Sequence, residues 1–355
     1  MSASKGADDA HNRDFFPDGR VSLLKETDSC SLVVVKRGVK GAPVVSQGDG
    51  NLEQFWALEE TRRQLDQWIE AALEEDRATD DGTSVLFDDP QVRARAVVSS
   101  RQRGVVCGTL AMSAVFEQLD SKCQTVRRIF DGDTISDGSE VMVVDGPLPV
   151  LLAGERTALN IGAFLCGIAT RTSAMVRAAG AAMVFDTRKT LPGLRQFQKQ
   201  AVRAGGGVSH RSHLGQFPMV KENHREWIQR GHPELANDSA AEIAFILERL
   251  RSSSDAQPIA IEVEDEPSFR ACLEQHVELI LIDNTDPETL SQWIQRARAD
   301  HLDVTPSRLE ASGGIDEGSV ASHVAAGIGR ISCGAITHSA PALDLSMQII
   351  EVPRS

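Results

Sequence analysis

The spacing of apolar residues changes along the first half of the chain. Between Leu52 and Leu73 apolar residues recur at helical intervals, which predicts an amphipathic helix. Short apolar runs then follow, separated by the Asp-Gly turns Asp131-Gly132 and Asp137-Gly138, and these runs predict β-strands. The expected strands are 92–98, 104–111, 125–129 and 141–144. A long apolar stripe of good helix formers predicts a helix from Glu155 to about Ala179.

The second half alternates between short apolar runs and helical segments. About six strands are expected, fewer than the eight of a closed barrel: 181–185, 217–220, 259–261, 279–282, 308–309 and 331–332. Helices are expected between several of them, at 240–251, 267–275, 287–299 and 318–326. Each apolar run ends on polar or glycine residues, and this arrangement is typical of a parallel β/α barrel with its chemistry at the strand ends.

These patterns predict an α/β protein with four parts. Residues 1–50 are rich in Gly, Ser, Asp and Lys and are expected to form a partly disordered extension. Residues 51–153 are expected to form a first domain and residues 154–338 a β/α barrel. Residues 339–355 are expected to form an apolar helix that packs back on the first domain.

Composition excludes several classes of function. The 355 residues include 37 Lys and Arg against 51 Asp and Glu, for a net charge of −14, which argues against a general nucleic-acid or anionic-membrane binder. No uncharged apolar run reaches the roughly 18 residues of a membrane span, and the N-terminus lacks an apolar signal core. The six cysteines form no CxxC motif. A cytoplasmic protein without nucleic-acid or membrane partners is therefore expected.

One stretch is strongly basic in this acidic chain. Residues 187–221 contain seven Lys and Arg and no Asp or Glu. Arg188-Lys189 follow an expected strand, and His210-Arg211 follow the glycine run 205–207, where the backbone can approach a ligand. Arg and Lys at such places suit carboxylate or phosphate groups. A solvated basic helix face is the alternative, and it accounts for Arg195, Lys199 and Arg203 at intervals of four.

Acidic and glycine residues follow the later strands. Glu262, Glu264 and Asp283 end two of them, and carboxylates beside phosphate-binding cations indicate Mg²⁺ that bridges protein and diphosphate. Contacts to ribose hydroxyls or ordinary salt bridges to the basic strand ends are the alternatives. Ser312-Gly313-Gly314 and Gly334-Ala335 follow the last strands, where backbone N–H groups commonly bind phosphate.

A series of short motifs runs in one order along the chain. They are Glu155-Arg-Thr-Ala-Leu-Asn160, Gly167-Ile-Ala-Thr170, Asp186-Thr-Arg-Lys-Thr-Leu-Pro-Gly-Leu-Arg195, Ala201-Val-Arg203, Gly205-Gly-Gly207, His210-Arg211, Lys221-Glu-Asn-His224, Leu281-Ile-Asp-Asn284, Glu310-Ala-Ser-Gly-Gly314 and Gly334-Ala-Ile-Thr-His-Ser339. In these motifs the chain resembles the quinolinate phosphoribosyltransferase family, also called nicotinate-nucleotide pyrophosphorylase (carboxylating). The resemblance covers about residues 52–350.

The resemblance implies a fold, an assembly and a reaction. The fold would be an N-terminal α/β sandwich and a C-terminal open β/α barrel. The unit would be a homodimer or a higher homo-oligomer with shared active sites. The enzyme would join the ring nitrogen of quinolinate to the ribose of phosphoribosyl diphosphate, with Mg²⁺ as cofactor. The products would be nicotinate mononucleotide, diphosphate and CO₂.

The resemblance also implies roles for individual residues. Arg188, His210 and Arg211 would hold the acid. Lys189 and Lys221 would face the diphosphate, and Glu262 and Asp283 would hold ribose hydroxyls and Mg²⁺. The other expected substrate-binding residues are Arg156, Thr187, Ser312, Gly313, Gly314, Gly334 and His338, of which Ser312, Gly313, Gly334 and His338 would surround the 5′-phosphate.

Several positions depart from the pattern expected of the family. Pro149 stands where we expect an arginine that clamps the acid, and Gln216 and Ala260 stand where we expect acidic residues. Cys166 and Glu222 replace an expected serine and aspartate. These departures leave two alternatives open: a paralogue that uses a different aromatic acid, and a non-catalytic sugar-phosphate-binding protein of the same fold.

Overall fold

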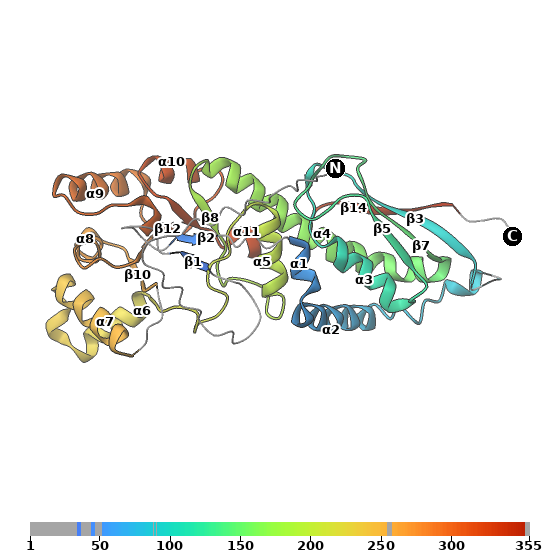
Figure 1. Cartoon of the computed structure of the whole chain (residues 1–355), viewed down its shortest axis with the longest axis horizontal. Coiled ribbons are helices and arrows are strands. Elements are labelled where there is room, and N and C mark those ends of the chain that lie inside the picture. The colour runs from blue at the N-terminus through green and yellow to red at the C-terminus, as the bar shows by residue number, and fades with distance from the viewer. Residues whose placement is uncertain are drawn as a thin grey trace, which may run out of the picture. The chain divides into compact units, whose positions relative to one another are not determined.

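The computed structural model describes residues 52–87, 89, 91–253 and 258–351. Before residue 52 it describes only the backbone of two short strands, β1 (Val34–Lys36) and β2 (Val44–Ser46), which pair antiparallel. Apart from these strands, the expected extension 1–50 lies outside the described residues. Figure 1 labels the elements along the chain.

An antiparallel sheet forms the first part of the fold. Its strands are β3 (Arg93–Ser100), β5 (Gln124–Arg127), β7 (Glu140–Pro147) and β14 (Leu345–Glu351), in the order β14-β3-β7-β5. Helix α3 (Thr109–Leu119) and the long helix α4 (Leu148–Ala179) pack against each other and against this sheet. Helices α1 (Leu52–Ala57) and α2 (Glu59–Glu75) precede it, and two short strands, β4 (Gly104–Val105) and β6 (Thr134–Ile135), pair beside it. The expected α/β class of this part is confirmed.

The expected strand 104–111 is wrong over its second half. The strand β4 ends at Val105, and helix α3 begins at Thr109 after Gly108, whose φ of 88° turns the chain. Helix α3 is buried on most of its surface, so its sequence lacks the polar face that marks an amphipathic helix. An apolar run of this kind cannot be told from a buried strand by its periodicity.

The expected C-terminal helix is also wrong. Residues 345–351 form strand β14, which pairs antiparallel with β3 at the edge of the first sheet. Leu345, Met347 and Ile349 alternate with other residues and pack on the core, which is the period of a strand. The segment does return to the first sheet, but through backbone pairing instead of helix packing.

A parallel sheet with helices around it forms the second part (Figure 1). Its six strands are β8 (Met183–Phe185), β9 (Met219–Val220), β10 (Ala260–Val263), β11 (Leu279–Asp283), β12 (Leu309–Ser312) and β13 (Arg330–Ser332), in the order β8-β13-β12-β11-β10-β9. The first strand therefore pairs with the last, as in a barrel. Phe185 of β8 also forms a parallel bridge with Val208 on its other side. No ladder among the described residues joins this edge to β9, so the barrel is open, as expected.

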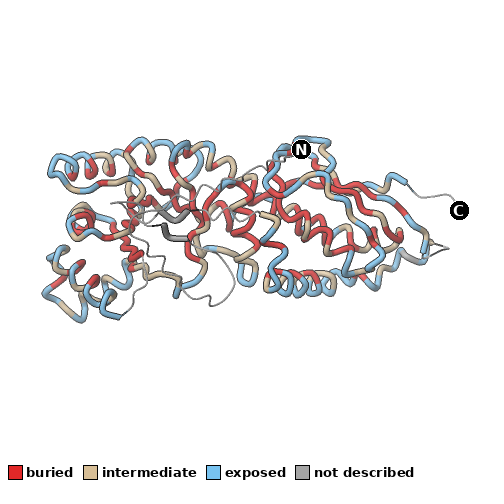
Figure 2. The backbone as a smooth tube through the Cα atoms, in the orientation of Figure 1, coloured by how far each residue is buried: buried red, intermediate tan, exposed pale blue. Residues whose placement is uncertain are grey.

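Helices connect and cover these strands. They are α5 (Arg195–Ala204), α6 (Glu222–Gly231), α7 (Ser239–Ser253), α8 (Glu266–Glu274), α9 (Pro287–Ala299), α10 (Val320–Ala325) and α11 (Ala335–His338). Figure 2 shows the strands buried and the outer faces of the helices exposed. The four helices expected at 240–251, 267–275, 287–299 and 318–326 are confirmed, with ends shifted by at most two residues.

Alternate residues of the barrel strands face two different environments. Ile261 and Val263 of β10 belong to the main core. Ala260 instead packs in a small separate cluster with Leu279 and Leu281, bordered by Phe217 and Met219. Because side chains alternate along a strand, Glu262 shares the face of Ala260, and Asp283 shares the face of Leu281. The same alternation places Glu310 and Ser312 of β12 on the inner face.

Helix α4 begins seven residues before its expected start, at Leu148. Pro149 lies in its first turn, where the missing N–H and fixed φ of proline suit a helix start. By length and composition α4 could cross a membrane, but 56% of its most apolar window is buried inside the protein. Its apolar character therefore reflects a core helix.

The two Asp-Gly turns that look alike in the sequence differ in the structure. Asp137 is exposed, whereas Asp131 is only 8% exposed and accepts hydrogen bonds from several buried donors. The Trp56 Nε1 donates to its Oδ2 at 2.8 Å, and the backbone N–H groups of Gly108 and Thr109 donate at 3.0 and 3.2 Å. Asp131 therefore joins α1 to the start of α3.

We predict that Asp131→Ala destabilises the protein strongly. The substitution leaves an indole N–H and two backbone N–H groups buried without their acceptor, which should lower the free energy of unfolding by about 3 kcal/mol. Denaturant unfolding of the purified protein measures the change. Asp137→Ala, in the exposed turn, is the control and should change stability by less than about 0.5 kcal/mol. Equal losses for the two variants would contradict the role given to Asp131.

Candidate active site

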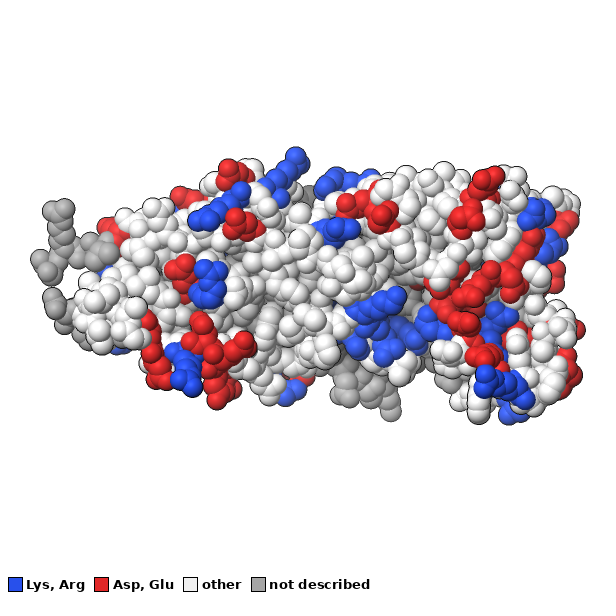
Figure 3. All heavy atoms as spheres, turned by 180° about the vertical axis from the view of Figure 1, so that it is seen from behind, with Lys and Arg blue, Asp and Glu red and all other residues white. Residues whose placement is uncertain are grey.

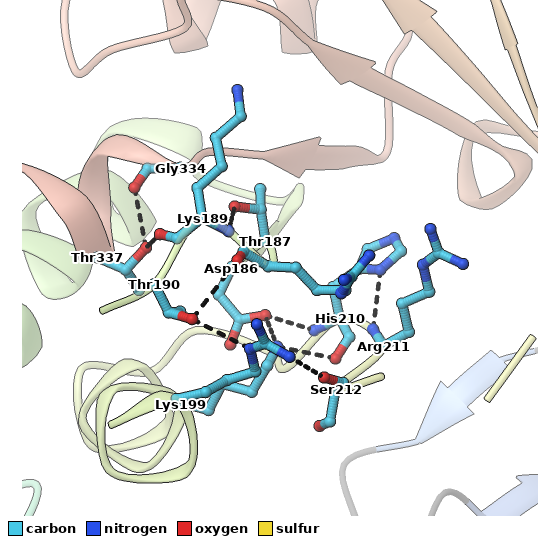
Figure 4. Close-up of polar contacts among 12 residues, drawn as sticks. Asp186, Thr187, Lys189, Thr190, Lys199, His210, Arg211, Ser212, Gly334 and Thr337 are labelled. Carbon is cyan, nitrogen blue, oxygen red and sulfur yellow. Dashed lines mark hydrogen bonds and ion pairs between the residues drawn. The ribbon is translucent and has the colours of Figure 1, made fainter. Parts of the chain in front are cut away.

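The strand β8 ends at a buried ion pair. Asp186 is fully buried, and its Oδ1 contacts the ammonium of Lys199, which is 4% exposed on α5. The backbone N–H of His210 donates to the same Oδ1 at 2.8 Å, and the Lys199 ammonium donates to the His210 carbonyl at 3.0 Å. Figure 4 shows these groups converging below the loop that carries Lys189. The pair therefore ties the end of β8 to the segment with His210 and Arg211.

Burial works against both charges of this pair. Desolvation raises the pKa of Asp186 and lowers the pKa of Lys199, while the contact between the two opposes both changes. The second carboxylate oxygen, Oδ2, is buried and has no hydrogen-bond partner among the described residues. The interpretation of α5 as a solvated basic face is therefore wrong, because Lys199 points inward. Arg195 also points inward and donates to the Ser212 carbonyl at 2.9 Å.

The glycine run 205–207 serves packing. A Cβ on Gly205 would lie 2.3 Å from the Ala169 carbonyl oxygen of α4, and a Cβ on Gly207 would lie 2.7 Å from the Thr172 side chain. The structure therefore gives these glycines a packing role, and their expected approach to a ligand stays a prediction. They let the segment before His210 lie directly against α4.

His210 lies between the basic segment and the barrel interior. Its Nδ1 accepts a hydrogen bond from the Arg211 backbone N–H at 2.8 Å, and its Nε2 lies 3.3 Å from Oε1 of Glu310. Glu310 is fully buried on β12, and the Nε of Arg330 on β13 donates to its other oxygen at 2.9 Å. Burial favours the neutral acid, but the His210 ring and the Arg330 guanidinium lower the pKa of Glu310 to about 2.

Two arginines lie close together on the basic side. Burial and the charge of Arg188 lower the pKa of Arg211. Arg211 is also held by the Phe217 carbonyl, to which its Nη1 donates at 3.0 Å. The Nε of Arg188 is buried without a hydrogen-bond partner in the described part of the chain. Two neighbouring guanidinium groups, one with an unused donor, favour an anionic ligand.

Lys189 and the last strand meet on the same side. The Lys189 backbone carbonyl accepts a hydrogen bond from the Thr337 hydroxyl at 2.9 Å. A Cβ on Gly334 would lie 2.9 Å from Cδ of Lys189 and 3.2 Å from the His338 ring, so glycine leaves room for both. Thr187 caps the loop, since its Oγ1 accepts from the Lys189 N–H at 3.0 Å. Figure 4 shows the Lys189 side chain extending away from the buried pair.

Acidic side chains gather at the ends of β10 and β11. Glu262 pairs with the ammonium of Lys221, which directly follows β9. Desolvation and the charges of Glu222, Asp283 and Glu262 raise the pKa of Glu264. These carboxylates therefore lie near enough to repel one another, and a cation between them would relieve the repulsion.

The ends of β11 and β12 meet at the edge of this acidic group. The Ser312 hydroxyl donates to Asp283 Oδ1 at 2.5 Å, and the Asn284 amide donates to Oδ2 at 2.8 Å. Gly313 has a φ of 89°, and a Cβ there would lie 2.2 Å from the Asn284 side-chain oxygen. Only glycine fits this close approach. Gly314 also has a positive φ, of 60°.

The strand ends bring most of the candidate residues to one edge of the barrel. Parallel pairing places Asp283 opposite Ser312, and it places Glu262 opposite Leu281, two residues before Asp283. Figure 3 shows a group of basic side chains directly beside a group of acidic ones on the barrel.

Arg156 lies elsewhere. It is exposed in the first half of α4, where it lines a cavity of about 260 Å³ with Trp68 of α2 and with Asp76, which directly follows α2. No contact in the described structure joins it to the strand-end residues.

The residues that depart from the expected pattern have local roles. The Gln216 side-chain oxygen accepts from the Ser212 N–H at 2.7 Å and closes the loop after Arg211. The Cys166 thiol donates to the Cys107 carbonyl at 3.3 Å inside the core. Ala260 fits the small apolar cluster inside the barrel.

We did not predict from the sequence that four charged residues are buried beneath the site. They are Asp186, Lys199, Glu310 and Arg330. A signal for Glu310 was present, because it is a charged residue that follows directly on an apolar run and precedes Ala311 in the same strand. Arg330 likewise directly precedes an apolar run. Their pairing across neighbouring strands could not be read from the sequence, since it depends on register.

Comparisons with known proteins place these observations in a family. Residues 80–166 match the model of the quinolinate phosphoribosyl transferase N-terminal domain, and residues 168–348 match that of its C-terminal domain. The chain is 34% identical over 284 residues to a probable nicotinate-nucleotide pyrophosphorylase [carboxylating] of Bacillus subtilis, covering 78% of this chain and 90% of that protein. It is 33% identical over 260 residues to the human nicotinate-nucleotide pyrophosphorylase [carboxylating], covering 72% of this chain and 82% of that protein.

A solved structure agrees with this relation. NadC from Streptococcus pyogenes superposes with a TM-score of 0.71 at 31% sequence identity, covering 82% of this chain and 99% of that protein. Two domain models matched in order, curated relatives above 30% identity and a shared fold all lead to the same result. The chain belongs to the quinolinate phosphoribosyltransferase family.

Proposed function

We propose that this protein is a phosphoribosyltransferase that joins quinolinate to phosphoribosyl diphosphate and releases diphosphate and CO₂, leaving nicotinate mononucleotide. The proposal rests on one observation: two neighbouring arginines and a group of acidic strand-end residues lie at the same edge of the barrel. The diacid fits the first group and the sugar diphosphate, with its metal, fits the second. The family relation supports both assignments.

The basic side suits an acceptor with two carboxylates. Arg188 and Arg211 lie close enough for the charge of one to lower the pKa of the other, and a doubly charged acid between them would compensate both. Arg211 is fixed by the Phe217 carbonyl, so its guanidinium is oriented before the ligand arrives. Such preorganisation lowers the entropic cost of holding the ring nitrogen in line with the ribose.

The other side suits the sugar diphosphate. Departure of diphosphate leaves positive charge on the ribose and adds negative charge to the leaving group. We assign Lys189 and Lys221 to the diphosphate and Glu262 and Asp283 to the ribose, which the Lys221–Glu262 pair and the Ser312 contact to Asp283 support. Ser312, Gly313, Gly314, Gly334 and His338 are assigned to the 5′-phosphate side.

The acidic group suits a Mg²⁺ ion that is bound by protein and substrate together. No cluster of three or more His, Cys, Asp or Glu residues in the described ranges could hold a metal alone. Glu262 and Asp283 would instead hold an ion that also binds diphosphate oxygens, as Mg²⁺ commonly does. When bound, it would neutralise charge on the leaving diphosphate.

Loss of CO₂ needs little from the protein. Once the ring nitrogen carries the ribose, its positive charge stabilises the carbanion that forms when the neighbouring carboxylate leaves. The carbanion then takes up a proton that comes from solvent and becomes the C–H of the product, and the protein holds the diacid in place.

Arg156 supports sites shared between two copies of the chain. It is exposed on α4 and has no contact with the strand-end residues of its own chain, so a symmetric partner could present it to the other site. We therefore propose a homodimer or a multiple of it. The cytoplasmic location stays a prediction from the sequence.

The direct test of the proposal is an assay with the purified full chain. We expect turnover with quinolinate, phosphoribosyl diphosphate and Mg²⁺, with equal amounts of diphosphate and CO₂. Removal of Mg²⁺ with a chelator should abolish it. Nicotinate, with one carboxylate, should react poorly because it leaves one guanidinium without a partner. Diphosphate release with another aromatic acid but not with quinolinate would support a paralogue, and no release with any acid would support a non-catalytic protein.

We predict that Lys189→Ala lowers kcat by at least about 100-fold while the fold is retained, because it removes a charge that stabilises the leaving group. Circular dichroism and thermal unfolding should match the wild-type protein, since Lys189 is exposed. Lys122→Ala, at an exposed lysine of the first domain, is the matched control and should leave kcat unchanged. Retained activity in Lys189→Ala would remove Lys189 from the diphosphate side.

We predict that Arg156→Ala is inactive alone but regains activity when mixed with Lys189→Ala. If each site uses Arg156 of one copy and Lys189 of the other, a mixed dimer contains one intact site. Denaturing and refolding equal amounts of the two variants together should restore about a quarter of the wild-type activity. No recovery, with dimers present by light scattering, would mean that both residues serve the same chain's site.

A further inference from the structure

Both ring nitrogens of His210 are directed to groups inside the protein. Nδ1 accepts the Arg211 backbone N–H at 2.8 Å, so the ring proton lies on Nε2. Nε2 faces Oε1 of Glu310 at 3.3 Å, and neither of these two atoms has a hydrogen-bond partner elsewhere in the described ranges. The ring is buried against Phe185 and Phe217, with centroid distances of 5.9 and 5.4 Å.

Glu310 and Arg330 are closed inside the barrel below this ring. They are 0% and 4% exposed, and they lie opposite each other on neighbouring strands. The Arg330 guanidinium donates to Glu310 and also stacks 3.9 Å from the centroid of the Phe185 ring. Neither side chain can reach a ligand at the barrel edge, so any effect on the reaction must pass through His210.

We propose that Glu310, held by Arg330, is a positioning residue for the acid-binding side, and that it acts by fixing the ring proton and orientation of His210. His210 then fixes the Arg211 backbone, whose guanidinium binds the acceptor. This inference rests on the proposed function for the identity of the acid. It gives His210 an indirect role in place of the direct contact with the acid that the family resemblance implies.

The chemistry of the contact makes the proton position matter. With the proton on Nε2, each ring nitrogen meets a partner of opposite kind: an acceptor carboxylate on one side and a donor N–H on the other. With the proton on Nδ1, two N–H groups would face each other at the Arg211 backbone. The carboxylate of Glu310 therefore selects the form of the ring that can hold Arg211.

Glu310→Gln tests this selection while it keeps the side-chain shape. An amide has one acceptor oxygen where the carboxylate has two, so the substituted side chain can accept from either Arg330 or His210 but not from both in the present geometry. We expect KM and the dissociation constant for quinolinate to rise by about 10- to 100-fold, the effect typical of removing the partner that orients a functional histidine. The dissociation constant for phosphoribosyl diphosphate should change by less than about threefold, because Glu310 and Arg330 contact none of the residues assigned to phosphoribosyl diphosphate.

A matched control separates positioning from stability. Glu242 is 1% exposed and paired with Arg225 at 2.7 Å, but it lies on α7 and contacts none of the acid-binding residues. Glu242→Gln should lower the melting temperature about as much as Glu310→Gln and leave the quinolinate constants within twofold of wild type. If Glu310→Gln also leaves them within twofold, Glu310 and Arg330 form only a structural pair and the proposal is overturned.

A double variant tests the route of the effect. His210→Asn keeps an acceptor near the Arg211 N–H but loses the contact with Glu310. If Glu310 acts through His210, adding Glu310→Gln to His210→Asn should cause no further loss of quinolinate binding. Losses that multiply would overturn the proposal.

A measurement without substrate keeps this inference separate from the proposed function. Nitrogen-15 NMR of the histidine rings should show the His210 proton on Nε2 in the wild-type protein and a changed proton distribution in Glu310→Gln. A His210 proton on Nδ1 in the wild-type protein would overturn the proposal even if quinolinate is turned over. If the proton lies on Nε2 but quinolinate is not turned over, the result would count against quinolinate as the acceptor. The positioning of His210 by Glu310 would still stand.

Discussion

The buried contact between Asp186 and Lys199 holds together the two segments that carry the basic half of the site. Asp186 immediately precedes the Thr187–Lys189 loop, and its carboxylate accepts the backbone N–H of His210. Lys199 completes the link through the His210 carbonyl. Because one pair binds both segments, the spacing between Arg188 and Arg211 depends on it.

Such a pair is a costly way to hold two loops. Both groups lose hydration, which raises the pKa of Asp186 and lowers the pKa of Lys199, and a buried pair often stabilises a fold no better than apolar side chains would. It does provide directional contacts to backbone atoms that apolar packing cannot give. With the Glu310–Arg330 pair inside the barrel, it fixes His210 at its backbone and at its ring. The site therefore uses buried charge for geometry.

The sequence predicted which polar residues lie at the strand ends, because that location follows from topology. Lys221, Glu262 and Asp283 each end or directly follow an apolar run, Lys189 follows one after three residues, and the ends of parallel strands meet at one edge. The six strands of the barrel were also readable, since each is a short apolar run between helical segments.

The failures have a common physical cause, which is contact between residues far apart in the chain. Helix α3 lacks a polar face because it is covered by elements that the local pattern does not show. Strand β14 is stabilised by backbone pairing with β3, about 250 residues earlier, as the Arg95–Glu351 ion pair illustrates. Lys199 has the spacing of an exposed helical face, and only the tertiary fold turns it toward Asp186.

One barrel edge is proposed to hold a diacid beside a sugar diphosphate. A crystal structure of the protein with quinolinate and an unreactive analogue of phosphoribosyl diphosphate tests it most directly. We predict that the two carboxylates lie between Arg188 and Arg211, and that the diphosphate lies between Lys189 and Lys221 with its metal on Glu262 and Asp283. A quinolinate molecule bound away from both arginines, or an analogue bound away from the strand ends, would contradict it.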